Sequence, residues 1–87
     1  MHAVIVNLTI TDPEAAERAL HEQLVPFVSQ APGFVAGYWT AEGKSALSML
    51  IFDTEEAAGA VRLNAAERVP DGVILDGIEV SPVVAHA

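Results

Sequence analysis

Residues 31–53, APGFVAGYWTAEGKSALSMLIFD, decide the fold, because they contain two apolar runs separated by a short turn. The pair Pro32-Gly33 ends whatever precedes it, and apolar and aromatic residues then run over residues 34–41. The tripeptide EGK offers a turn, and a second apolar run covers residues 46–52. The stretch therefore predicts a β-hairpin.

Both predicted strands carry large side chains on both faces, because side chains alternate along a strand. In the first strand, Phe34 and Tyr38 should share one face while Trp39 lies on the other. In the second strand, Met49 should oppose Leu50 in the same way. We expect helices to cover one face of this hairpin and a second copy of the chain to cover the other.

Alternation of apolar residues over residues 2–10 predicts a strand before the hairpin. A helix should then begin at Asp12, which can cap it, with Pro13 in the first helical position. Apolar residues at helical spacing extend this helix to near Gln30. Pro26 should kink the helix or tighten its last turn, because proline removes one backbone hydrogen bond.

After the hairpin, Asp53-Thr54 followed by two acidic residues predicts the start of a second helix. The turn residues at 70–72 lead to a last strand over residues 73–85, which Gly77 and Pro82 interrupt. A proline inside a strand is typical of a sheet edge, so this strand should be an edge.

The order strand, helix, strand, strand, helix, strand is the βαββαβ pattern of the ferredoxin-like fold, in the α+β class. We expect one domain over residues 1–87, with a four-stranded antiparallel sheet and both helices on one face. Every predicted strand is apolar on both faces to some degree. The uncovered face should therefore pack on that of a second copy, as in a dimeric α/β barrel.

The composition supports an apolar surface that the core alone cannot bury. Hydrophobic residues make up 52% of only 87 residues, so an interface or a ligand cavity should take the excess. The net charge of −8 argues against nucleic acid or anionic membranes as partners. No apolar run reaches membrane length, no signal peptide is evident, and cysteine is absent. We expect a cytoplasmic protein.

The chain resembles the dimeric α/β-barrel superfamily, in particular small proteins of the antibiotic biosynthesis monooxygenase type. The resemblance rests on the element order, on QAPGF at residues 30–34 and on FDTEEA at residues 52–57. It implies a scaffold that hosts cofactor-independent oxygenation of polycyclic phenols, haem degradation or lactone isomerisation. The second predicted helix has no histidine to serve as a haem ligand, so we expect no cofactor.

The resemblance also implies site residues. Asn7 resembles an asparagine that family members place in the first strand, facing the cleft between sheet and helices. Its amide could hold an oxygen or a substrate oxyanion, or could simply be exposed or singly bonded. Trp39 could stack on a flat ligand, and Phe52 stands where family oxygenases tend to carry a tryptophan. Arg62 and Arg68 could meet a phenolate or carboxylate over the cleft, or could face solvent.

Other residues point to an interface or to a metal. Tyr38, Trp39 and Met49 are candidates for the dimer interface, because the second sheet face needs cover. His2 and His86 should lie at the same end of neighbouring strands. Two histidines can begin a metal site, but no third ligand is evident beside them, so we expect no metal.

Two functions remain open. The first is a cofactor-independent monooxygenase-like protein that binds a flat apolar or aromatic molecule, positioned by Asn7 and one aromatic side chain. The alternative is a non-catalytic dimeric module with a ligand-binding or structural role. A cleft of several hundred cubic ångströms with Asn7 pointing inward favours the first. A filled cleft with Asn7 bonded to the backbone favours the second.

Overall fold

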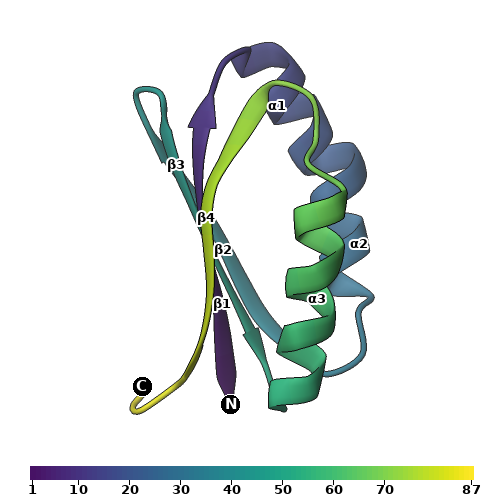
Figure 1. The fold of residues 1–87 in the computed structure, drawn as a ribbon, viewed down its shortest axis with the longest axis vertical. Coiled ribbons are helices and arrows are strands. Elements are labelled where there is room, and N and C mark those ends of the chain that lie inside the picture. Colours follow the sequence, from purple (N-terminus) through teal and green to yellow (C-terminus); the bar gives the residue numbers. More distant parts are fainter.

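A four-stranded antiparallel sheet forms one layer and helices form a second layer on one of its faces, in the computed structural model of residues 1–87 (Figure 1). The spatial order of the strands is β2-β3-β1-β4. This arrangement confirms the ferredoxin-like α+β fold. In chain order the elements are β1 (His2–Ile10), α1 (Pro13–Ala19), η1 (Leu20–Leu24), α2 (Val25–Ser29), β2 (Phe34–Glu42), β3 (Ser45–Phe52), α3 (Glu55–Glu67) and β4 (Val73–Pro82).

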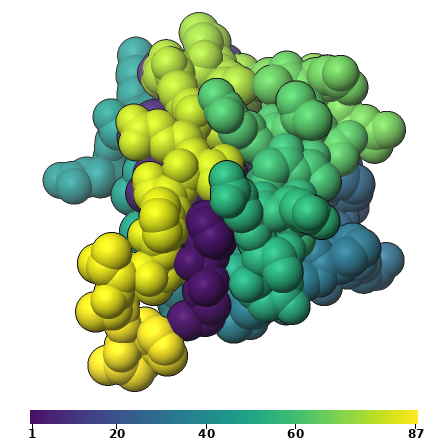
Figure 2. All heavy atoms as spheres, turned by 60° about the horizontal axis from the view of Figure 1, so that its bottom comes forward, coloured from purple at the N-terminus to yellow at the C-terminus, as the bar shows by residue number.

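Strand β4 is an edge, as Pro82 predicted, but it ends at Pro82 and not near residue 85. Proline has no backbone N–H to continue the ladder, so the chain leaves the sheet there. The Val83 amide still donates to the Met1 carbonyl at 2.9 Å. Figure 2 shows the last residues, in yellow, projecting beside the purple N-terminus.

The first helical region begins as expected, because the Asp12 carboxylate accepts from the Ala15 amide at 3.2 Å. The turn before Pro26 widens into the π-helical segment η1, where the Val25 amide donates to the Leu20 carbonyl five residues back. The wider turn accommodates the proline ring, which would clash with a carbonyl in regular α-helix. At the helix end, the Ala31 amide donates to the Val28 carbonyl three residues back, at 3.1 Å, which is a tightened turn of the kind expected from the sequence.

A β-bulge at Val35 changes which aromatic residues share a face of β2. The pairing of β2 with β3 shifts between Phe34 and Ala36, so Val35 is an extra residue. Phe34 therefore packs against the core, whereas Tyr38 is 63% exposed on the opposite face. The expectation that Phe34 and Tyr38 share one face of β2 is therefore wrong. Trp39 lies on the same side as Phe34 and also packs against the core.

The hydrophobic core lies between the sheet and the helices. We call the helix-covered side of the sheet the inner face and the other side the outer face. Phe52 and Val4 are the largest fully buried side chains, and Phe52 meets Phe34 edge to face at 5.9 Å between ring centres. The buried cluster joins strands and helices through Val4, Val6, Val28, Leu50, Phe52, Ala58 and Val61.

No element of the chain covers the outer face, which is apolar along its central strands and carries Asp76 and Glu79 on the edge strand β4 (Figure 1). Met49 is 38% exposed at the centre of this face, between Tyr38 on β2 and Ile5 on β1. The central strands β1 and β3 contain no Asp, Glu, Lys or Arg.

Among the helices on the other side, none is long and apolar enough to cross a bilayer.

Candidate ligand-binding pocket

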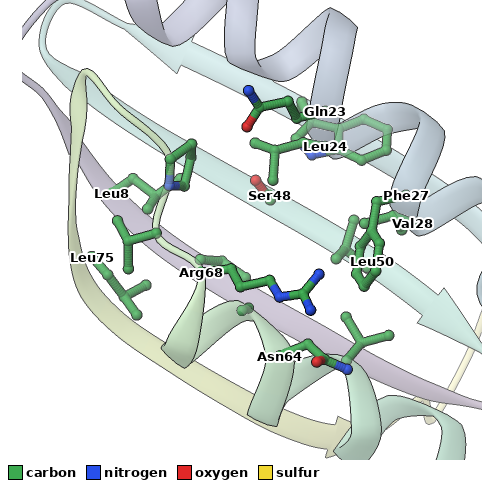
Figure 3. Close-up of a pocket in the computed structure, with 16 residues that line it drawn as sticks. Leu8, Gln23, Leu24, Phe27, Val28, Ser48, Leu50, Asn64, Arg68 and Leu75 are labelled. Carbon is green, nitrogen blue, oxygen red and sulfur yellow. The ribbon is translucent and has the colours of Figure 1, made fainter.

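A cavity of about 330 Å³ lies between the inner face of the sheet and the helices (Figure 3). The strands form its floor, η1 and α2 form one wall, and α3 with the turn after it forms the other. Most of the lining is apolar. The apolar contributors are Val6, Leu8, Trp39, Leu50 and Leu75 from the strands, Leu24, Phe27 and Val28 from η1 and α2, and Val61, Ala65, Val69 and Pro70 from α3 and its turn.

Small side chains on facing elements leave this space open. Ser48 lies on the floor opposite Trp39 in the ladder, and Ala65 lines the pocket from α3. Larger residues at these two positions would occupy the cavity. The π-helical segment η1 contributes to the same wall through Leu24, so the local widening that Pro26 requires also shapes the pocket.

Four polar side chains line the cavity. Ser48 is only 6% exposed, and none of the side-chain hydrogen bonds in the structure uses its hydroxyl. Asn64 on α3 donates its amide hydrogen to the Ala60 carbonyl at 3.1 Å, which leaves its amide oxygen unused. Gln23 comes from η1, and Arg68 directly follows α3 (Figure 3). These groups can orient a ligand that has a small number of polar atoms.

Arg68 bridges the two helical walls. Its guanidinium carbon lies 5.9 Å from the centre of the Phe27 ring on α2. Figure 3 shows the side chain running from the end of α3 toward Phe27, with the guanidinium on the same side of the pocket as Asn64. No acidic residue lines the cavity, so Arg68 is its single charged group.

The structure separates the residues that the sequence grouped in one cleft. Trp39 does line the pocket. Asn7 alternates with Val6 and Leu8 and is exposed on the outer face, so it does not point into the cleft. Phe52 is fully buried in the core and Arg62 is exposed on α3, and neither lines the cavity.

The candidates for the interface separate in the same way. Tyr38 and Met49 lie on the outer face and are exposed. Trp39 lies on the inner face beneath the helices, so a dimer of facing sheets cannot use it. The reason is the alternation of neighbouring strand residues, combined with the bulge at Val35.

Sequence reasoning did not select Gln23, Ser48 or Asn64, and of the two arginines it selected Arg62 as the candidate, whereas Arg68 lines the cavity. A signal was present for two of them. Ser48 interrupts an apolar strand on the same face as Leu50, and Asn64 lies three residues after Val61 on the buried side of α3. A polar residue on a buried face is a sign of a site or of a bonded core residue.

The histidines at the sheet end lie outside this pocket. His2 places its Nε2 4.0 Å from the Glu55 carboxylate, while its Nδ1 is buried without a hydrogen-bond partner. His86 is exposed beyond the end of β4. No three His, Cys, Asp or Glu side chains gather closely enough to hold a metal ion.

Several solved structures share this fold, three of which come from Pseudomonas and Streptomyces species. MupZ from Pseudomonas fluorescens superposes with a TM-score of 0.70 at 14% identity, over 91% of this chain and 65% of MupZ. The cofactor-independent oxygenase SnoaB from Streptomyces nogalater gives 0.63 at 17% identity, over 98% of this chain and 95% of SnoaB. A monooxygenase from the gene ActVA-Orf6 of Streptomyces coelicolor, in complex with nanaomycin D, gives a TM-score of 0.59 at 16% identity, over 99% of this chain and 90% of that protein.

These similarities confirm the ferredoxin-like α+β fold that the sequence predicts. The present chain spans just under two thirds of the length of MupZ. No protein-family model and no curated protein sequence matches the chain. Sequence identities this low establish the fold and leave chemistry to be argued from the site itself.

Proposed function

We propose that this protein binds a flat, apolar or aromatic small molecule in the pocket between its sheet and helices. The observation that carries the proposal is a largely apolar cavity of about 330 Å³ with a few polar groups in its lining. That combination is typical of small-molecule sites, which range over roughly 300–1,000 Å³. The volume is at the lower end of this range, which favours a compact ligand of two or three fused rings.

The shape of the pocket also favours a planar ligand. Trp39 and Phe27 offer aromatic surface from the floor and from one wall. Aromatic side chains bind flat molecules by stacking or by edge contacts. The ActVA-Orf6 protein, which shares this fold, was solved with nanaomycin D bound, and this supports a role for the fold in holding such compounds.

The functional unit in this proposal is a homodimer that joins two outer faces. Tyr38, Met49 and Ile74 expose apolar surface there, at 63%, 38% and 53%. The chain has a net charge of −8, yet the two central strands of that face carry no charged residue. Acidic residues of this face, Asp76 and Glu79, lie on the edge strand β4, so two copies can approach through the uncharged central strands. A two-fold axis closes the assembly.

Oxygenation of the bound molecule is the second candidate function. It is favoured by the shared fold with SnoaB, a cofactor-independent oxygenase. In such a reaction the substrate is itself the reductant. A phenol and O₂ give a quinone and water, so that one oxygen atom enters the ring and the other leaves with two hydrogens. The unused Asn64 amide oxygen and the Ser48 hydroxyl would orient the phenol.

Binding is tested with N-phenylnaphthylamine, a neutral aromatic probe whose fluorescence rises in apolar surroundings. We expect the protein to bind it, and Ala65→Phe to remove the signal by filling the pocket. Ala66→Phe is the matched control, because the neighbouring residue is exposed and does not line the cavity. Equal binding by both variants would place the probe elsewhere and overturn the proposal.

Oxygenation is tested separately, by measuring O₂ uptake with naphthols and anthrones as probe substrates. Turnover by the parent protein that Ala65→Phe abolishes and Ala66→Phe retains would support catalysis in the pocket. Binding of the same compounds without O₂ uptake would favour the non-catalytic ligand-binding role.

A further inference from the structure

We propose that the pocket selects ligands that carry a single negative charge, and that Arg68 binds the oxyanion of the ligand. This inference rests on the proposed binding function and specifies its ligand class. The ligand would combine an apolar aromatic body with one ionised group, such as a phenolate, a carboxylate or a sulfonate. The Arg68 guanidinium can present two parallel N–H donors to such a group.

The distribution of charge is the first observation. The chain contains twelve acidic residues and four Lys or Arg residues. None of the acidic residues lines the cavity, whereas one of the four cations does. A strongly acidic protein thus surrounds a pocket whose own lining carries a positive charge. Arg68 is itself exposed, so it lies at the rim of the pocket, where its charge acts on a ligand group in direct contact with it.

The second observation is that Arg68 has no carboxylate partner. The single ion pair within 4.0 Å in the structure joins His2 to Glu55. The guanidinium carbon of Arg68 lies 5.9 Å from the centre of the Phe27 ring. A cation–π contact at an exposed site is weak, whereas a hydrogen bond between two charged groups is among the strongest in proteins. A ligand oxyanion can therefore draw the guanidinium from the ring.

The carbonyl end of α3 lies beside the same group and opposes the binding of an anion. Arg68 follows Glu67, the last residue of the helix, and its amide donates to the Asn64 carbonyl at 3.0 Å. The end of a helix carries the equivalent of roughly half a negative charge. The full positive charge of the guanidinium exceeds it, and Arg68 extends away from the helix end toward Phe27 (Figure 3).

Arg62 provides the internal comparison. It lies within α3, is exposed like Arg68 and has no carboxylate partner either, but it does not line the cavity. Removing either arginine changes the net charge of the protein by the same amount. If substitution of Arg68 changes the affinity and substitution of Arg62 does not, the effect comes from a local contact and not from the net charge of the protein.

The test uses two probes with the same aromatic skeleton, the neutral N-phenylnaphthylamine and the anionic anilinonaphthalene sulfonate. We expect Arg68→Gln to weaken binding of the sulfonate by about tenfold, the lower end for a hydrogen bond to a charged group. Binding of the neutral probe should stay within about twofold, because packing changes little. Arg62→Gln should leave both affinities unchanged. Added salt should weaken the sulfonate alone.

Other results would overturn either the charge inference or the proposed binding function. If Arg68→Gln weakens both probes equally, Arg68 acts by packing and the charge inference is wrong. An unchanged affinity for the sulfonate, or equal losses in the two arginine variants, also overturns it. If the parent protein binds neither probe, or Ala65→Phe leaves binding intact, the pocket function itself fails. If the expected results are obtained, competition with naphthol, naphthoate and naphthalene sulfonate distinguishes phenolate, carboxylate and sulfonate as the bound group.

Discussion

Trp39 and Ser48 face each other across the β2–β3 ladder, so the largest side chain on the inner face lies beside one of the smallest. The indole packs against the core, and Ser48 leaves an open space next to it on the pocket floor. The size of the residue at position 48 therefore sets the capacity of the cavity.

We expect Ser48→Leu to abolish binding of N-phenylnaphthylamine without destabilising the fold. Leucine would fill the cavity above the floor, and the substitution removes a hydroxyl that makes no hydrogen bond to the chain and leaves no buried polar partner behind. Thermal melting and probe titration measure the two effects. Ser48→Ala is the control and should bind the probe normally, since it leaves the cavity open. Retention of full affinity by the leucine variant would contradict the location of the site.

The two asparagines should behave differently. Asn64→Ala is expected to weaken naphthol binding by about threefold to tenfold, as for a lost neutral hydrogen bond, because Asn64 lines the cavity. Asn7→Ala should leave the affinity unchanged, because Asn7 is exposed on the outer face. Isothermal titration of both variants makes the comparison. Weaker naphthol binding by Asn7→Ala would instead support the site role that the family resemblance implies for Asn7.

Met49→Lys should dissociate the proposed homodimer. Met49 lies at the centre of the outer face, so a two-fold axis would bury two unpaired lysines together. Light scattering on a dilution series measures the mass. Leu63→Lys is the control, because Leu63 is 70% exposed on α3, on the other side of the molecule. A parent protein that is monomeric at high concentration would refute the dimer.

Substitutions of two glycines by alanine should have opposite effects on stability. Gly33 has φ = 81°, and a Cβ there would clash with the Asp53 carboxylate and lie 2.9 Å from the Ala57 Cβ. Gly33→Ala should lower the free energy of unfolding by more than about 1 kcal/mol. Gly59, inside α3, has open space around it, and Gly59→Ala should raise that free energy by about 0.5–1 kcal/mol. Chemical denaturation tests both, and equal effects would contradict the backbone described for Gly33.

Local patterns in the sequence determined the elements and their order. The alternation in His2–Ile10, the cap at Asp12 and the turn at Gly43 all act over a few residues. Pro82 indicated the sheet edge because proline cannot donate to a ladder. These features depend on backbone sterics and local hydrogen bonds, which neighbouring residues decide. They were sufficient to predict the ferredoxin-like fold.

The tertiary structure decided which side chains form the pocket. Periodicity divides β1 into two faces but does not say which face the helices cover, so Asn7 could not be placed from sequence. The bulge at Val35 comes from pairing with β3, and it separates Phe34 from Tyr38. Arg68 lies just beyond the end of α3, so helical periodicity does not predict its direction. Each of these depends on contacts between segments distant in the chain, which no local pattern encodes.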